Sequence, residues 1–185
     1  LVVGAYGKTY TGLVKTGKIF SYKFDETGYN FSFYEADNND NKFGWCVKFA
    51  DTFEPIVLAV TARKTIKIFN FDSADKLTYC NMIESELSTD GIYVPKIICF
   101  ENSIIIGIPE GGVAGAGNVK VFDYDFRGMK LNNTIKLFDI DTRSFGRFGM
   151  DFDFDNNMLY IGEPFKIDNY GNKKGQIVQY SRQPD

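Results

Sequence analysis

The chain has 185 residues, of which 44% are hydrophobic and 24% charged, and its formal net charge is −3. This composition is typical of a globular protein and excludes wholesale disorder. The small net charge and the lack of a lysine or arginine run argue against nucleic-acid binding, and we expect Lys173-Lys174 to lie at a solvated hairpin tip. No apolar stretch approaches 18 residues, so the sequence contains no membrane span.

The predicted elements are all β-strands. Aromatic residues make up 16% of the chain, and large rings favour sheets over helices. No stretch keeps the apolar spacing of an amphipathic helix. In chain order, alternating apolar residues and turn residues predict strands over 1–5, 17–24, 29–35, 43–49, 56–62, 65–71, 77–83, 94–100, 103–108, 118–126, 133–138, 145–154, 158–162 and 176–181.

A short pattern recurs four times along the chain: an apolar run, a glycine-containing turn and a second apolar run. Corresponding positions lie roughly 45–57 residues apart, which is the period of a four-stranded propeller blade. We therefore predict an all-β fold, a partial β-propeller of about three and a half blades. The approximate units are 1–41 (partial), 42–91, 92–143 and 144–185 (partial).

A partial ring exposes the apolar faces of its end blades. Those faces need a cover, which could be the remainder of the same polypeptide, a second copy or a partner protein. Because the chain opens directly on a strand, we expect a mature or excised segment of a longer protein.

Three glycine-rich phrases in register resemble the FG-GAP repeat. The "FG" half is matched by Phe43-Gly44 and by the stretch 145–149 (Phe-Gly-Arg-Phe-Gly). The "GAP" half is matched by the turns that contain Gly4, Gly107 and Gly162. The strand after the turn is matched by the segments that begin at Gly17, Gly117 and Gly175.

The resemblance covers nearly the whole chain and implies a propeller like that of integrin α-subunits, used in adhesion or protein binding. In such a blade, the phenylalanine ahead of the first strand would wedge between neighbouring blades. Two positions depart from the pattern. The second unit reads Val60-Thr61-Ala62-Arg63 where glycine and proline are expected, and the third unit lacks an FG before Tyr93.

Some blades of this family hold calcium in an acidic loop, and Asp151, Asp153, Asp155 and Asn157 form the comparable element here. Alternate residues of a strand point to one face, and hard cations prefer oxygen ligands. The four residues are therefore a candidate calcium site, the chain's only predicted cofactor. The alternative is an exposed polar face, because the family's loop is longer and contains glycine.

A longer polar loop is the candidate binding rim. It contains Asp168, Asn169, Tyr170 and Asn172, and propellers usually bind their ligands at such rims. The glycine-rich stretch 111–117 lies at the equivalent connection of the preceding unit and is predicted to be a hairpin connection. No helix or lysine follows it as a phosphate-binding loop requires.

The sequence offers little for catalysis. It has no histidine, the commonest general base, so we predict a non-enzymatic protein. Glu163 is interpreted as a turn substitution and Trp45 as a residue packed between blades.

The sequence does not decide the cellular compartment. Cys46, Cys80 and Cys99 form no metal or redox motif; a Cys46–Cys99 bridge is conceivable, but buried free thiols are the commoner outcome. Asn30 and Asn132 begin two N-glycosylation sequons, and glycans there would favour an extracellular or cell-surface glycoprotein.

These observations favour a propeller that binds a protein or glycan partner in a cell-surface or adhesion-type complex. Two alternatives remain: a structural scaffold subunit of a large intracellular assembly, and the regulatory propeller of a hydrolase whose catalytic domain lies outside this chain.

Overall fold

The computed structural model describes residues 1–5, 17–26, 28–35, 43–50, 56–60, 65–84, 96–111, 115–137 and 145–181. In this part of the chain every regular element is a β-strand, which confirms the predicted all-β class. No helix long and apolar enough to cross a bilayer occurs among these residues.

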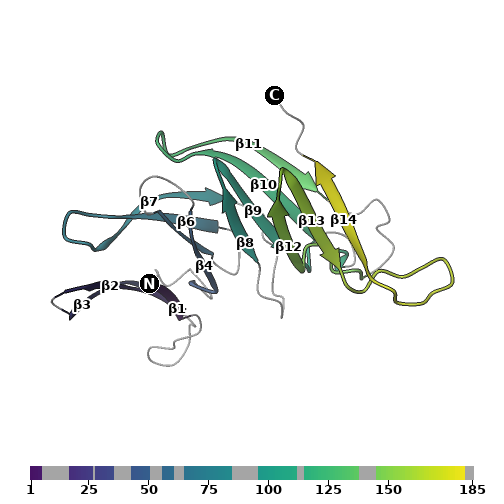
Figure 1. Cartoon of the computed structure of the whole chain (residues 1–185), viewed down its shortest axis with the longest axis horizontal. Coiled ribbons are helices and arrows are strands. Elements are labelled where there is room, and N and C mark those ends of the chain that lie inside the picture. The colour runs from purple at the N-terminus through teal and green to yellow at the C-terminus, as the bar shows by residue number, and fades with distance from the viewer. Residues whose placement is uncertain are drawn as a thin grey trace. The chain divides into compact units, whose positions relative to one another are not determined.

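The strands form four separate sheets. In each sheet the strands lie side by side in chain order, and the pairing is antiparallel (Figure 1). The first sheet contains β1 (Val2–Ala5), β2 (Lys18–Asp25) and β3 (Gly28–Glu35), and the second contains β4 (Cys46–Phe49), β5 (Val57–Val60), β6 (Thr65–Phe71) and β7 (Leu77–Glu84). The third sheet contains β8 (Ile97–Phe100), β9 (Ser103–Ile108), β10 (Asn118–Asp125) and β11 (Lys130–Leu137), and the fourth contains β12 (Asp151–Asp155), β13 (Met158–Glu163) and β14 (Gln176–Ser181).

The chain divides into two compact units. Unit 1 comprises residues 1–90 with 126–130, and unit 2 comprises 91–125 with 131–185. Unit 1 thus holds the first and second sheets, and unit 2 holds the third and fourth. Each sheet takes all its strands from one of the four ranges 1–41, 42–91, 92–143 and 144–185.

The core of unit 1 lies between its two sheets. Ile19 of β2 faces the second sheet and packs with Phe43, Phe69 and Leu77, all of them buried. The ring of Tyr34 closes this cluster, with its centroid 4.8 Å from that of Phe69 and 5.8 Å from that of Phe43. The aromatic residues that the sequence offers in excess therefore hold the sheets together.

Unit 2 repeats this arrangement. Its core cluster contains Ile105, Val119, Phe148, Phe152, Leu159 and Ile161. Phe148 is fully buried, as Phe43 is in unit 1. Each of these phenylalanines precedes the first strand of the later sheet in its unit and packs between the two sheets of that unit.

Glycines allow the close approach that this packing needs. A Cβ on Gly4 would overlap the carbonyl oxygen of Gly44, and a Cβ on Gly17 would overlap that of Phe43. In unit 2, a Cβ on Gly107 or Gly117 would overlap the corresponding oxygens of Gly149 and Phe148. A Phe-Gly turn of one sheet thus lies directly against two glycines of the preceding sheet in each unit.

Four strand predictions were wrong by three residues or more at their N-terminal ends. The strand predicted over 133–138 begins earlier, at Lys130, and the one predicted over 94–100 begins at Ile97. The strand predicted over 43–49 begins at Cys46, and the one predicted over 145–154 begins at Asp151. In the last two cases the chain turns first, because Gly44 and Gly149 have φ angles of 75° and 82°, which no extended strand contains. In unit 2 the turn equivalent to Phe43-Gly44 is Phe148-Gly149, whereas Phe145 is 65% exposed.

The hairpin between β12 and β13 turns on Asn156 and Asn157, whose φ angles of 47° and 62° are both left-handed. A two-residue turn of this kind favours glycine at its second position. We expect Asn157→Gly to raise the free energy of unfolding by about 0.5 kcal/mol, and Asn157→Val to lower it by about 1 kcal/mol because a β-branched residue resists this backbone. Urea denaturation followed by circular dichroism would measure both, and equal effects of the two substitutions would contradict the assignment.

Candidate binding site

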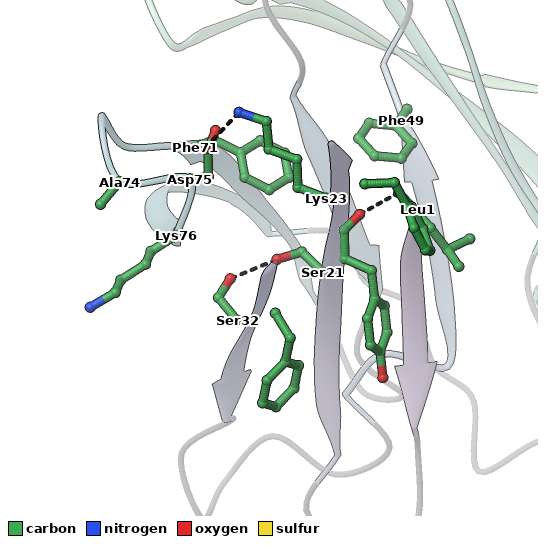
Figure 2. A pocket seen from close by; sticks show the side chains of 12 residues that line it. Leu1, Ser21, Lys23, Ser32, Phe49, Phe71, Ala74, Asp75 and Lys76 are labelled. Carbon is green, nitrogen blue, oxygen red and sulfur yellow. Dashed lines mark hydrogen bonds and ion pairs between the residues drawn. The ribbon is translucent and has the colours of Figure 1, made fainter. Parts of the chain in front are cut away.

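An open groove of about 690 Å³ lies in unit 1. Its residues come from the first sheet and from β4, β6 and the turn that joins β6 to β7 (Figure 2). The lining residues are Leu1, Ser21, Tyr22, Lys23, Phe24, Phe31, Ser32, Phe49, Phe71, Ala74, Asp75 and Lys76.

A pair of hydroxyl groups lies in the groove. Ser21 of β2 is directly opposite Ser32 of β3, and their Oγ atoms are 2.6 Å apart. The backbone N–H of Leu77 also donates to the Ser32 hydroxyl, at 3.4 Å. The two serines therefore satisfy each other and tie the first sheet to the start of β7.

An ion pair crosses the groove. The Lys23 ammonium lies 2.7 Å from the Asp75 carboxylate, and both side chains remain about half exposed, at 54% and 42% (Figure 2). An exposed pair of this kind contributes only about 0–1 kcal/mol to stability. Because both charged groups remain about half exposed, a ligand in the groove can reach a cation and an anion here.

Aromatic rings supply the apolar part of the groove. Phe71 lies beside the Lys23–Asp75 pair, and Phe49 lies beside Leu1 (Figure 2). Phe49 is 41% exposed. Rings that remain partly in water, next to hydroxyl and charged groups, favour binding of a ligand with an apolar side chain and a polar backbone.

The wall that carries Asp75 is a turn held by Asp72. The Asp72 carboxylate accepts hydrogen bonds from the backbone N–H groups of Ala74 and Lys76, both at 2.9 Å, and the N–H of Asp72 donates to the Lys76 carbonyl at 3.0 Å. Asp75 is left-handed here, with a φ of 59°. The turn fixes the position of Asp75 relative to Lys23.

The predicted rim loop is built on the same plan. The Asp168 carboxylate accepts from the N–H groups of Tyr170 and Asn172, both at 2.9 Å, and the Lys174 ammonium lies 3.0 Å away. Gly171 has a left-handed backbone and stands three residues after Asp168, as Asp75 stands three residues after Asp72. Asp168 and Asn172 are therefore occupied in shaping the loop, and Tyr170, which is 89% exposed, is its most available group.

These hydrogen bonds and the nearby cation lower the pKa of Asp168 to about 2, with the N–H of Asn172 as the largest cause and Lys174 next. Because the pKa is depressed on folding, the charge stabilises the loop above about pH 4 and loses this effect as the pH falls toward 2. We expect the amide resonances of Tyr170 and Asn172 to titrate with a midpoint near pH 2 in an NMR titration. The transition should be absent in Asp168→Asn, and a midpoint near 4 in the native chain would contradict the geometry.

The candidate calcium residues do not converge. Asp151, Asp153 and Asp155 lie on one face of β12, as predicted, but alternate strand positions are about 7 Å apart. The Asp151 carboxylate lies 2.6 Å from the Lys96 ammonium, which lowers its pKa. Asn157 is a turn residue, and no group of three metal-ligating side chains occurs in the described part of the chain. Calcium binding remains a prediction.

The other predicted residues are placed as follows. Asn132 and Thr134 of one sequon are exposed on β11, whereas the side chain of Asn30 lies outside the described residues. Lys174 is largely exposed near the hairpin tip, as expected. All three cysteines are half-buried rather than buried. Trp45 is buried.

Sequence reasoning missed the groove and one buried carboxylate. The polar residues Ser21 and Lys23 interrupt the apolar face that begins at Ile19, and this was the available signal for the groove. Glu163 is not a turn residue but the fully buried last residue of β13, where it accepts a hydrogen bond from the Gln176 side chain at 2.6 Å.

No protein-family model matches the sequence, and a search of curated proteins finds no match.

Proposed function

We propose that this chain is a non-enzymatic binding module of the FG-GAP kind, part of a β-propeller that recognises a protein partner. The observation that carries the proposal is the groove of unit 1, where aromatic rings, paired hydroxyls and an exposed ion pair meet. The cell surface is the compartment we favour, and the exposed sequon at Asn132 supports it.

The propeller assignment is supported by how the sheets are made. Each sheet is a meander of consecutive strands, and in both units the later sheet inserts a buried phenylalanine against the earlier one. Sheets that pack face to face in chain order are the building principle of a propeller. The Phe-Gly turns and their glycine partners coincide with the residues that resemble the FG-GAP repeat.

Binding is favoured over catalysis by the state of the polar groups in the groove. The Ser21 and Ser32 hydroxyls bond to each other, and the chain has no histidine to activate them. Asp75 is paired with Lys23. What the groove offers is apolar area of Phe49 and Phe71 with donors and acceptors beside it, which suits an extended peptide segment that inserts an aromatic or aliphatic side chain.

A displayed peptide library selected on the full chain tests the proposal. We expect the enriched peptides to share an apolar anchor and to bind at least tenfold more weakly to the double variant Phe49→Ser/Lys23→Ala, because it removes the exposed ring and the cation. Phe145→Ala in unit 2 removes an exposed ring that belongs to neither the groove nor the rim loop. It is the matched control and should bind as the native chain does. Peptides that are insensitive to the groove variant, or selection of glycans alone on an array, would contradict a peptide groove.

A further inference from the structure

In each unit, a Phe-Gly turn packs against two glycines of the earlier sheet. The fourth sheet carries glycines at the same two positions. In the first sheet, Gly4 pairs with Ile19, and in the third sheet, Gly107 pairs with Val119. In the fourth sheet, Gly162 pairs with Ile177 in the same register. Gly175 stands one residue before β14, as Gly17 and Gly117 stand before β2 and β10.

The two occupied examples show what these glycines contact. The Phe-Gly turn lies so close that a Cβ on Gly44 would be 2.7 Å from the Lys18 carbonyl oxygen and 3.1 Å from Cγ2 of Ile19. A Cβ on Gly149 would be 2.8 Å from the Asn118 carbonyl oxygen and 2.7 Å from Cγ2 of Val119. Ile19 and Val119 have no exposed surface as a result.

In the fourth sheet the same place is open. Among the described residues, a Cβ on Gly162 would approach only the Asp151 carbonyl oxygen, at 3.3 Å. The three atoms nearest to a Cβ on Gly175 belong to its own hairpin, the Pro164 carbonyl oxygen first, at 3.1 Å. Ile177 is 76% exposed. A hollow of about 380 Å³ lies here, lined by Met150, Asp151, Gly162, Glu163, Pro164, Gln176 and Ile177.

The second sheet lacks the glycine, and it is also not followed by a Phe-Gly turn. Val60 of the second sheet occupies the position of Gly4, because it pairs with Ile66 as Gly4 pairs with Ile19. The sequence has no Phe-Gly pair before β8, the next first strand along the chain. A glycine socket and a following Phe-Gly turn are therefore present together or missing together.

From this we infer that the outer face of the fourth sheet is a socket for a Phe-Gly turn that leads into a β-strand, presented by a further sheet of the same kind. The socket is formed by Gly162, Gly175 and Ile177. Asp153 and Asp155 are exposed on the same face, so the incoming segment should carry positive charge. A second intact copy of this chain is not the occupant we propose, because its Phe43 and Phe148 are already fully buried.

A peptide of residues 42–50 with Cys46→Ser is the probe, since it carries a Phe-Gly turn, a strand sequence and two lysines. Titrated into ¹⁵N-labelled full chain up to about 1 mM, it should shift the amide resonances of Gly162, Gln176 and Ile177. The same peptide with Phe43→Ala should bind at least tenfold more weakly. A peptide of residues 147–155, with three aspartates, should also bind more weakly.

Gly162→Ala is the matched receptor variant. Its new methyl group would lie 3.3 Å from the Asp151 carbonyl oxygen, a tight contact that a shift of a few tenths of an ångström relieves. Its melting temperature should therefore stay close to that of the native chain, while binding of the probe is lost. Ile177→Glu should also abolish binding. Because Ile177 is exposed, this variant can replace the alanine variant in the test if the alanine variant fails to fold. Shifts that persist in both variants, equal binding of the alanine peptide, or no shifts at all would overturn the inference. The groove of unit 1 is not involved, so Phe49→Ser/Lys23→Ala should bind the probe normally.

Discussion

Gly107→Ala is expected to lower the free energy of unfolding by about 3 kcal/mol or more. The added Cβ would overlap the carbonyl oxygen of Gly149 and lie 2.8 Å from the Phe152 ring. Backbone atoms cannot move aside as a flexible side chain can, so the two sheets of unit 2 must separate and lose part of their packing. Urea denaturation followed by circular dichroism measures the loss.

Gly162→Ala is the control for this prediction, because Gly162 has the same register position in the fourth sheet without a neighbouring turn. Its effect should stay within about 1 kcal/mol, since alanine suits a strand slightly better than glycine does. Gly4→Ala should resemble Gly107→Ala, because its Cβ would overlap the Gly44 carbonyl oxygen in unit 1. If Gly107→Ala and Gly162→Ala were equally mild, the close contact between sheets would be refuted.

Phe148→Ala is expected to lower the free energy of unfolding by about 3–5 kcal/mol, the range for a fully buried phenylalanine. The ring packs in a cluster with Ile105, Val119 and Leu159, so its removal leaves a cavity between the two sheets. Phe145→Ala, only three residues away, should cost no more than about 0.5 kcal/mol because Phe145 is 65% exposed.

The same experiment can be run on unit 1. Phe43→Ala should destabilise to a similar extent, and the fluorescence of Trp45, the chain's single tryptophan, reports on that unit alone. Because the chain has two units, the unfolding curve need not be a single transition, and each variant should shift the transition of its own unit. A large effect of Phe145→Ala with a small effect of Phe148→Ala would show that the wrong phenylalanine has been assigned to the turn.

The strands were predictable because alternation and turn residues act locally. The segments 65–71, 103–108 and 176–181 match β6, β9 and β14 at both ends. The errors before β4 and β12 arose where an apolar phenylalanine continued the alternation although a left-handed glycine had already turned the chain. The two Phe-Gly pairs in 145–149 could not be ranked from the sequence, since only packing shows which ring is buried.

The candidate site was less predictable, because it depends on which residues of distant segments come together. Ser21 and Ser32 are opposite each other only through the β2–β3 register, and Lys23 meets Asp75 across 52 residues of chain. The polar loop between β13 and β14 was predicted from its composition, but the role of its aspartate, which holds the loop through backbone hydrogen bonds, was not. The spacing of the three aspartates was enough to predict that they share one face of the strand. Whether such a face can hold a metal ion also depends on the distance between the side chains along the strand, which the pattern does not give.

Nuclear Overhauser effects from the two turn phenylalanines test most directly whether a Phe-Gly turn packs the two sheets of each unit together. The Phe43 ring should show cross-peaks to Tyr34 and Phe69, whose ring centroids lie 5.8 Å and 6.0 Å away, and the Phe148 ring should show them to Val119 and Tyr180. Cross-peaks to Val119 and Tyr180 from the Phe145 ring instead, or none between Phe43 and Tyr34, would contradict the account.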